Sequence, residues 1–80
     1  MGKLYQVGSI IVRVYANDHL PYHFHIISPD FEALVLIETL TVQEGTLPAT
    51  ARKQVMPWIE AHRAEIAAEW NRINPRFPIF

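Results

Sequence analysis

The stretch VMPWIEAHRAEIAAEWNRI, residues 55–73, decides most of the fold. Large apolar residues and one histidine recur in it at spacings of three and four, the period of one face of an α-helix. The members of this stripe are Val55, Trp58, Ile59, His62, Ile66, Trp70 and Ile73. The pattern predicts a long amphipathic helix, and because both tryptophans share the apolar stripe, we expect them to anchor a core.

Prolines suggest where this helix begins and ends. Pro48 suits a first helical turn, where its missing N–H leaves no hydrogen bond unmade, and Thr46 is a candidate cap. At the other end, Pro75 pushes the residue before it out of the helical region. We therefore expect the helix over residues 46–74. Inside it, Pro57 removes one backbone hydrogen bond and crowds the preceding turn, so we expect a kink or a restart there.

The residues before the helix are typical of β-strands. Residues 10–15 alternate with a period of two, and residues 22–27 are aromatic and β-branched. Residues 32–38 are apolar on both faces, which favours a central strand, and residues 40–44 form a short fourth strand. The sequence predicts an α+β fold: an antiparallel sheet of three to four strands, followed by one long, kinked C-terminal helix packed on it.

The chain is expected to form a single domain over residues 1–80. Strands and a histidine-rich turn occupy residues 1–45, the helix residues 46–74, and an extended apolar tail residues 75–80. A chain this short buries roughly 60–65% of the surface that its unfolded form exposes. The apolar side chains of the tail are poorly suited to water. They are expected to cover the edge of their own sheet or to dock on another chain, including a second copy.

Composition and charge exclude several classes of protein. Without cysteine, neither disulfides nor thiolate metal sites can form. A net charge of −1 gives no general attraction to nucleic acid or to an anionic membrane, although it does not forbid nucleic-acid binding. No apolar run approaches the ~18 residues of a membrane span, and the N-terminus lacks a signal-peptide pattern. A cytoplasmic location is the simplest expectation.

The stretch DHLPYHFH, residues 18–25, carries the candidate functional site. His23 and His25 lie two apart on a predicted strand, so their side chains leave the same face about 6–7 Å apart. Two imidazoles at that spacing can approach one metal ion, at Zn–N distances of roughly 2.0–2.1 Å. Such donors suit a divalent transition metal such as zinc, with iron, nickel and manganese as alternatives. The candidate metal ligands are Asp18, His19, His23 and His25.

Simpler interpretations compete with this site. Asp18 can form an Asx-type turn with His19 beside it in solvent. His62 can be a core histidine bonded to a carbonyl or to a glutamate, Glu32 or Glu38. If the helix covers the His23/His25 face of the sheet, all four histidines converge. If it covers the opposite face, that of Phe24 and Ile26, His62 is separate.

The histidines also allow catalysis without a metal. Two imidazoles with pKa values near the unperturbed value of about 6.5 can share proton delivery and removal in phosphodiester cleavage. An arginine, Arg13 or Arg63, would then bind the phosphate. The candidate catalytic residues are His19, His23, His25 and His62.

The run from Tyr15 to His25 resembles the signature of a bacterial family of small proteins known as domain of unknown function 4160, whose members typically read Tyr-x-x-Asp-His-x-Pro-Pro-His-Phe-His. The resemblance continues through residues 44–48 and the helical residues 58–66 to Trp70, and so covers nearly the whole chain. The chain departs from the pattern at two positions, Tyr22 and Pro57, and neither departure removes a histidine.

The resemblance implies no established activity. Members of the family are often encoded beside another small protein, an arrangement that looks like a toxin–antitoxin or similar two-gene cassette. The sequence and the resemblance together predict a protein-binding or regulatory partner that carries a histidine-rich site. The alternative is an enzyme, either a histidine-dependent ribonuclease or a metal-dependent hydrolase, that uses the same histidines.

Overall fold

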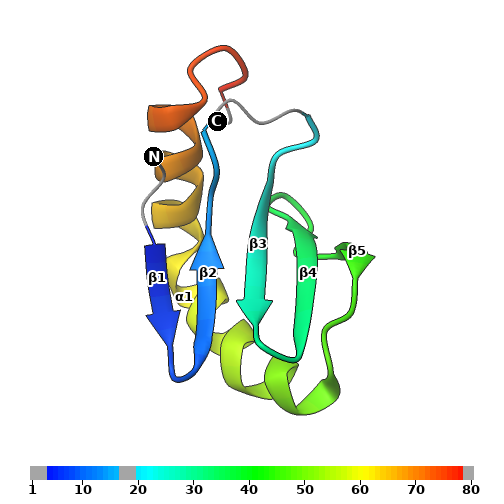
Figure 1. Cartoon of the computed structure of the whole chain (residues 1–80). Helices are drawn as coiled ribbons and strands as arrows, with labels where there is room; N and C mark the ends of the chain where they lie inside the picture. Colours follow the sequence, from blue (N-terminus) through cyan, green and yellow to red (C-terminus); the bar gives the residue numbers. More distant parts are fainter. Residues whose placement is uncertain (1–3, 17–19, 79–80) are drawn as a thin grey trace.

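A computed structural model describes residues 4–16 and 20–78 of the chain. In it, five strands form one antiparallel sheet in the order of the chain, and a single long helix follows them (Figure 1). The predicted α+β fold is thereby confirmed. The elements are β1 (Leu4–Val7), β2 (Ile10–Arg13), β3 (His23–Ser28), β4 (Phe31–Leu36), β5 (Val42–Gly45) and α1 (Ala49–Ile73).

Strand β1 is one strand more than the three to four expected from the sequence. It pairs with β2 through a tight turn at Gly8. The φ of Gly8 is 63°, in the left-handed region that glycine adopts without steric cost. The run is only four residues long, so it presents too few residues on each face for a period of two to be recognised. A short strand is therefore the element most easily missed by pattern alone.

The last two strands also differ from their expected ranges. β4 ends at Leu36 and β5 begins only at Val42, because a tight turn separates them. In that turn the N–H of Leu40 donates to the carbonyl of Leu36 at 2.8 Å, and Leu40 has a φ of 57°. This left-handed conformation is uncommon for a leucine, so the sequence gives no sign of the turn.

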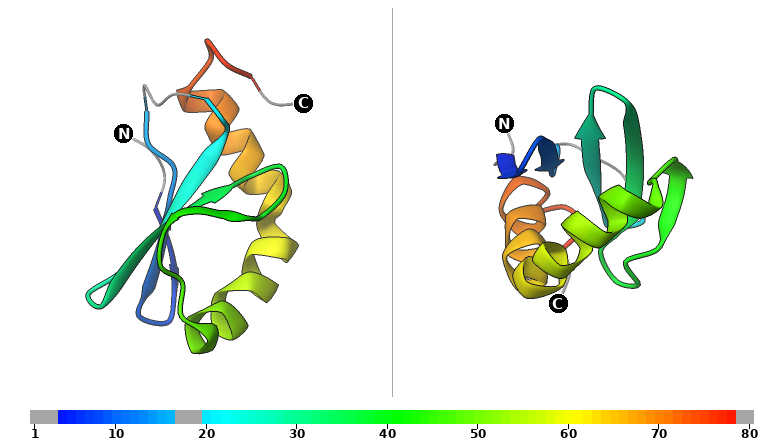
Figure 2. Two further views of the ribbon diagram at one scale, coloured as in Figure 1. Left: turned by 90° about the vertical axis from the view of Figure 1, so that its right-hand side faces the viewer. Right: turned by 90° about the horizontal axis from the view of Figure 1, so that it is seen from below.

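Helix α1 begins at Ala49, later than the predicted residue 46. The N–H of Thr46 donates to the carbonyl of Glu32 at 3.0 Å, which extends the contact between β5 and β4 instead of capping the helix. Pro48 is the residue that precedes the helix, and no side-chain cap is present. The helix continues through the exposed Pro57 as one element and bends along its length (Figure 2). None of the helices in the described ranges could cross a membrane.

One face of the sheet packs against α1 and forms the core (Figure 2). Cross-strand pairing places Val12 beside Ile26 and Phe24 beside Val35 on this face, and all four are fully buried. The helix contributes the apolar stripe predicted from its sequence. Its buried large residues are Val55, Ile59, Ile66 and Trp70.

The C-terminal tail turns back over the end of the helix. The indole N–H of Trp70 donates to the carbonyl of Phe77 at 2.7 Å, and the N–H of Phe77 donates to the carbonyl of Asn74 at 3.1 Å. The Phe77 side chain itself remains exposed. The last two apolar residues, 79 and 80, lie outside the described part, so docking of the tail on a second chain stays a prediction.

Candidate functional site

His23 and His25 lie side by side on β3, as the two-residue spacing predicts. Their ring centroids are 5.2 Å apart with an angle of 70° between the ring planes. His23 is 1% exposed, whereas the His25 side chain is 18% exposed. The Nδ1 of His23 lies 2.7 Å from the carbonyl of Pro21. A carbonyl only accepts, so Nδ1 carries the proton and Nε2 is the basic nitrogen of the neutral ring.

The end of the helix packs against His23. Pairing between β2 and β3 stops at Arg13 and His25, beyond which the two strands diverge (Figure 1). There the Trp70 ring lies 5.5 Å from His23, and Asn74 Nδ2 donates to the carbonyl of Tyr15 at 2.9 Å. Trp70 is fully buried. The position of His23 is therefore fixed by packing as well as by its strand.

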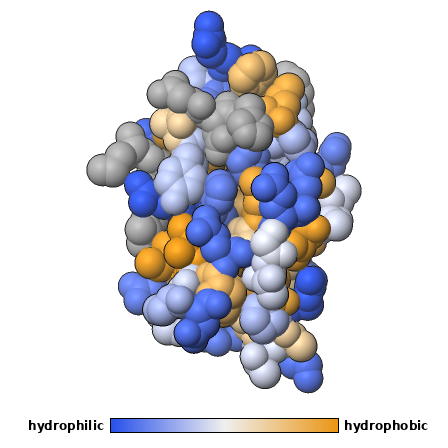
Figure 3. Space-filling view, turned by 45° about the vertical axis from the view of Figure 1, so that its right-hand side comes forward, coloured by the Kyte–Doolittle hydropathy of each residue, from blue (hydrophilic) through white to orange (hydrophobic). Residues whose placement is uncertain are grey.

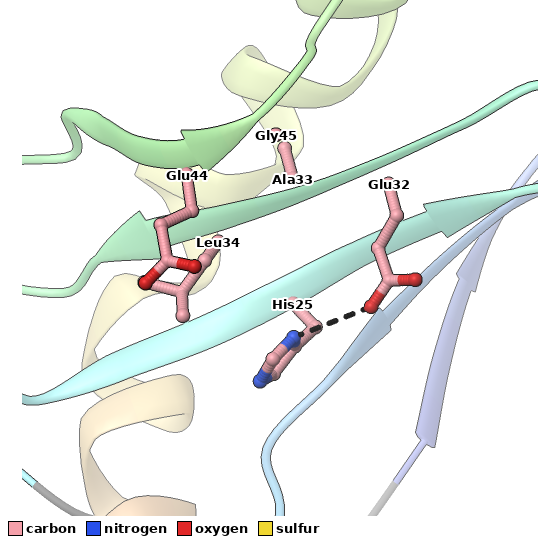
Figure 4. Close-up of a pocket in the computed structure, with 6 residues that line it drawn as sticks. All are labelled: His25, Glu32, Ala33, Leu34, Glu44 and Gly45. Carbon is pink, nitrogen blue, oxygen red and sulfur yellow. Dashed lines mark ion pairs between the residues drawn. The ribbon is translucent and has the colours of Figure 1, made fainter.

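Charged and aromatic groups surround His25. Its Nδ1 lies 3.6 Å from Glu32 Oε2 (Figure 4), and the Tyr15 ring meets its ring edge-on at 4.7 Å. Arg13 is its cross-strand partner on β2, with the guanidinium 4.8 Å from the centre of the Tyr15 ring. A shallow pocket beside His25 is lined by His25, Glu32, Ala33, Leu34, Glu44 and Gly45 (Figure 4). The site thus combines a cation, two imidazoles and two carboxylates.

His62 does not join His23 and His25. Its Nδ1 lies 2.7 Å from the carbonyl of Trp58, and its ring stacks on the Trp58 ring at 4.1 Å. Trp58 in turn contacts Tyr5 of β1. His62 precedes Trp70 by eight helical residues, about 12 Å along the axis. The helix covers the sheet face of Phe24 and Ile26, so of the two arrangements expected from the sequence, the one that keeps His62 apart from His23 and His25 is present. The bond of His62 to a carbonyl is the one expected for a core histidine.

A metal site stays a prediction. Within residues 4–16 and 20–78, no three histidine, aspartate or glutamate side chains are placed to hold a metal ion. Asp18 and His19 lie outside the described residues. A site for zinc or a similar ion would therefore need them beside His23 and His25.

The structure distinguishes the two arginines proposed to bind phosphate. Arg63 is held by the β4–β5 turn, where its Nε donates to the carbonyl of Ile37 at 3.0 Å and its Nη2 to the carbonyl of Glu38. It therefore ties α1 to the sheet. Arg13 is the arginine beside the histidines.

Several neighbours of the histidines were missed at the sequence level. In the sequence, Tyr15 is recognised only as the first residue of the family signature, Trp70 only as a core anchor, and Glu32 only as a partner of His62. The turn Pro29-Asp30 contained a usable signal for Glu32, because counting back from a hairpin turn places Glu32 opposite Ile27, next to His25. Trp70 had no such signal, since its contact depends on where the helix lies.

Residues 9–71 match the model of a protein family described as Domain of unknown function (DUF4160). The chain belongs to the DUF4160 family. The histidines of β3 and most of the helix fall within the matched range of this DUF4160 domain. No curated protein and no solved structure matches the chain.

Proposed function

We propose that this DUF4160 domain is a protein-binding, regulatory module that contacts its partner through the sheet face opposite α1. We call this the outer face. A single observation supports the proposal: four aliphatic side chains lie there only half-buried, although the described helix packs on the other side. Apolar surface rimmed by polar groups is typical of interaction sites. The four residues are Ile11, Ile27, Leu34 and Leu36.

Figure 3 shows one side of the molecule, on which hydrophobic residues lie among hydrophilic ones. A mixed surface of this kind is compatible with an interface, because interfaces as a whole are about as apolar as the rest of a protein surface. The near-complete burial of His23 also favours binding over catalysis, because a substrate would have access to one histidine of the pair only. By resemblance to the family, the product of a neighbouring gene in a two-gene cassette is the first partner to test.

Replacing Leu34 with lysine is expected to abolish capture of the partner. The Leu34 side chain lies on the outer face between His25 of β3 and Glu44 of β5, half-buried, so a charge there removes an apolar contact and must be desolvated on binding. Affinity capture with the purified chain and the neighbouring gene product measures the loss. Circular dichroism shows whether the variant keeps the fold.

Ala61 provides the matched control. It is exposed on α1 and lines a separate groove with Ala64 and Arg63, so lysine at position 61 changes the charge equally but away from the sheet. Ala61→Lys should retain the partner. A partner lost with Ala61→Lys but kept with Leu34→Lys would move the interface to the helix and overturn the proposed surface.

A second candidate function is histidine-dependent phosphodiester cleavage. The observation that favours it is the grouping of Arg13, His25 and Glu32, with Arg13 opposite His25 in the ladder and Glu32 3.6 Å from the His25 ring. A cation for the phosphate beside an imidazole–carboxylate pair is a suitable set for acid–base chemistry. His23, although nearly fully buried, lies beside His25 as the second imidazole, and a metal-dependent hydrolase is the variant that also uses Asp18 and His19.

On this second proposal, the double substitution His23→Ala/His25→Ala is expected to lower RNA cleavage at least about 100-fold, the smallest usual contribution of general acid–base groups. His62→Ala is the control, because His62 lies apart from the pair. Elemental analysis of the wild-type protein and of these two variants tests whether the site binds a metal ion. Stoichiometric metal that is lost only in the double variant supports the hydrolase, and cleavage that is unchanged in the double variant rules out the histidine mechanism.

A further inference from the structure

Across β2 to β5, the outer face carries a transverse row of four side chains with opposite charges at its two ends. Register places Arg13 of β2 opposite His25 of β3, His25 opposite Leu34 of β4, and Leu34 opposite Glu44 of β5. Figure 4 shows the last three of these side chains on one side of the sheet. With strands about 4.8 Å apart, the row spans roughly 15 Å from its positive end to its negative end.

Such a row is complementary in charge to the same row on a second copy of the chain related by a two-fold axis. When two copies stack outer face to outer face about an axis parallel to the strands, the β2 side of one lies over the β5 side of the other. Arg13 of each copy then faces Glu44 of its partner, and His25 faces Leu34. Symmetry makes each of these contacts occur twice, as in any isologous interface.

The same charges exclude the other simple stacking. An axis running across the strands would place Arg13 on Arg13 and Glu44 on Glu44, and like charges brought together at an interface are unfavourable. The aliphatic residues Ile11, Ile27 and Leu36 flank the row and are covered in the favourable stacking, in which Glu32 of each copy lies over Ile27 of the other. Two sheets packed in this way with nearly aligned strands form a common sandwich arrangement.

We propose that the occupant of the outer face is a second copy of this chain, stacked face to face with Arg13 against Glu44 of its partner. The proposal rests on the proposed function, because it names the partner of the same surface. The four strands that the row crosses offer a contact area at the small end for stable interfaces, so the dimer is a weak and reversible one. A different protein that binds the outer face therefore competes with the second copy.

Charge reversal and charge exchange test this pairing. Sedimentation velocity of the full chain, over a wide range of concentration, gives the dimer dissociation constant. Glu44→Arg and Arg13→Glu, each alone, should raise it roughly tenfold or more, because each replaces two attractions with two repulsions. The double exchange Arg13→Glu/Glu44→Arg should restore the wild-type constant. Arg52→Glu, an exposed change on α1, is the control and should leave it unchanged.

Glu44→Arg keeps the test informative if Arg13→Glu disturbs the fold, because Glu44 is exposed on an edge strand whereas Arg13 packs on Tyr15. A chain that stays monomeric at every concentration overturns the dimer, and so does a dimer unaffected by Glu44→Arg. The proposed function fails separately: it falls if Leu34→Lys changes neither self-association nor capture of the neighbouring gene product. A monomer that loses that product on Leu34→Lys overturns the dimer alone.

Discussion

Trp70→Ala is expected to lower the free energy of unfolding by about 3–5 kcal/mol, the usual cost of removing a buried aromatic side chain. Trp70 is fully buried, contacts the rings of Tyr22 and His23, and donates its indole N–H to Phe77. An 80-residue domain has a total stability of roughly 4–12 kcal/mol at 0.05–0.15 kcal/mol per residue. The variant should therefore lose between about a quarter and all of the domain's stability, as measured by urea denaturation followed by circular dichroism.

Two matched variants separate the causes of this loss. Trp70→Phe keeps an aromatic ring in the core but removes the hydrogen bond to Phe77, so it should cost less than the alanine variant. Trp58→Ala removes the same side chain from the same helix, at a half-buried position near Tyr5. If Trp58→Ala proved as costly as Trp70→Ala, then Trp70 would not be the anchor of the core at this end of the helix.

Local pattern predicted the elements that are long and strongly periodic. The apolar stripe of α1 repeats over several turns, so its existence and its packing face followed directly from the sequence. β1 has four residues, and the turn before β5 depends on a left-handed Leu40, so neither left a pattern to recognise. Prediction weakened wherever an element was too short to show its period.

The face that the helix covers could not be chosen from the sequence. Strand β4 is apolar on both sides, with Ala33 and Val35 facing the helix and Leu34 and Leu36 facing away from it. Periodicity therefore admits both faces as the core. The position of His62 depends on which face is the core, because His62 lies on the helix and therefore on the side of the sheet that the helix covers.

The candidate site was predictable only in its local part. The shared side of His23 and His25 follows from the alternation of a strand. Their neighbours come from distant segments: Trp70 lies 47 positions after His23, and it reaches that ring only because β2 and β3 diverge beyond Arg13. Non-local contacts of this kind depend on topology and twist, which a single sequence does not specify.

Gly45→Ala is expected to lower the free energy of unfolding by about 2–5 kcal/mol, the second large effect, because of where Gly45 lies. Its φ is 81°, in the left-handed region, which costs an alanine about 1–2 kcal/mol. A Cβ at this position would also lie 2.1 Å from the carbonyl oxygen of Glu32 and 3.1 Å from Ala33 Cα. Both are backbone atoms of β4 and cannot swing aside, so the strands must separate at a further cost of about 1–3 kcal/mol.

Gly8→Ala is the control that isolates the cost of the steric clash with β4 from the cost of the left-handed backbone. Gly8 has a similar φ of 63°, but a Cβ there would meet the side-chain amide of Gln54, which can rotate away. In thermal unfolding, about 1 kcal/mol shifts the midpoint of so small a domain by about 4–8 °C. Gly45→Ala should therefore lower the midpoint clearly more than Gly8→Ala does. Equal midpoints would mean that β5 moves freely from β4, and the row that ends at Glu44 would then lack the rigid register on which face-to-face pairing depends.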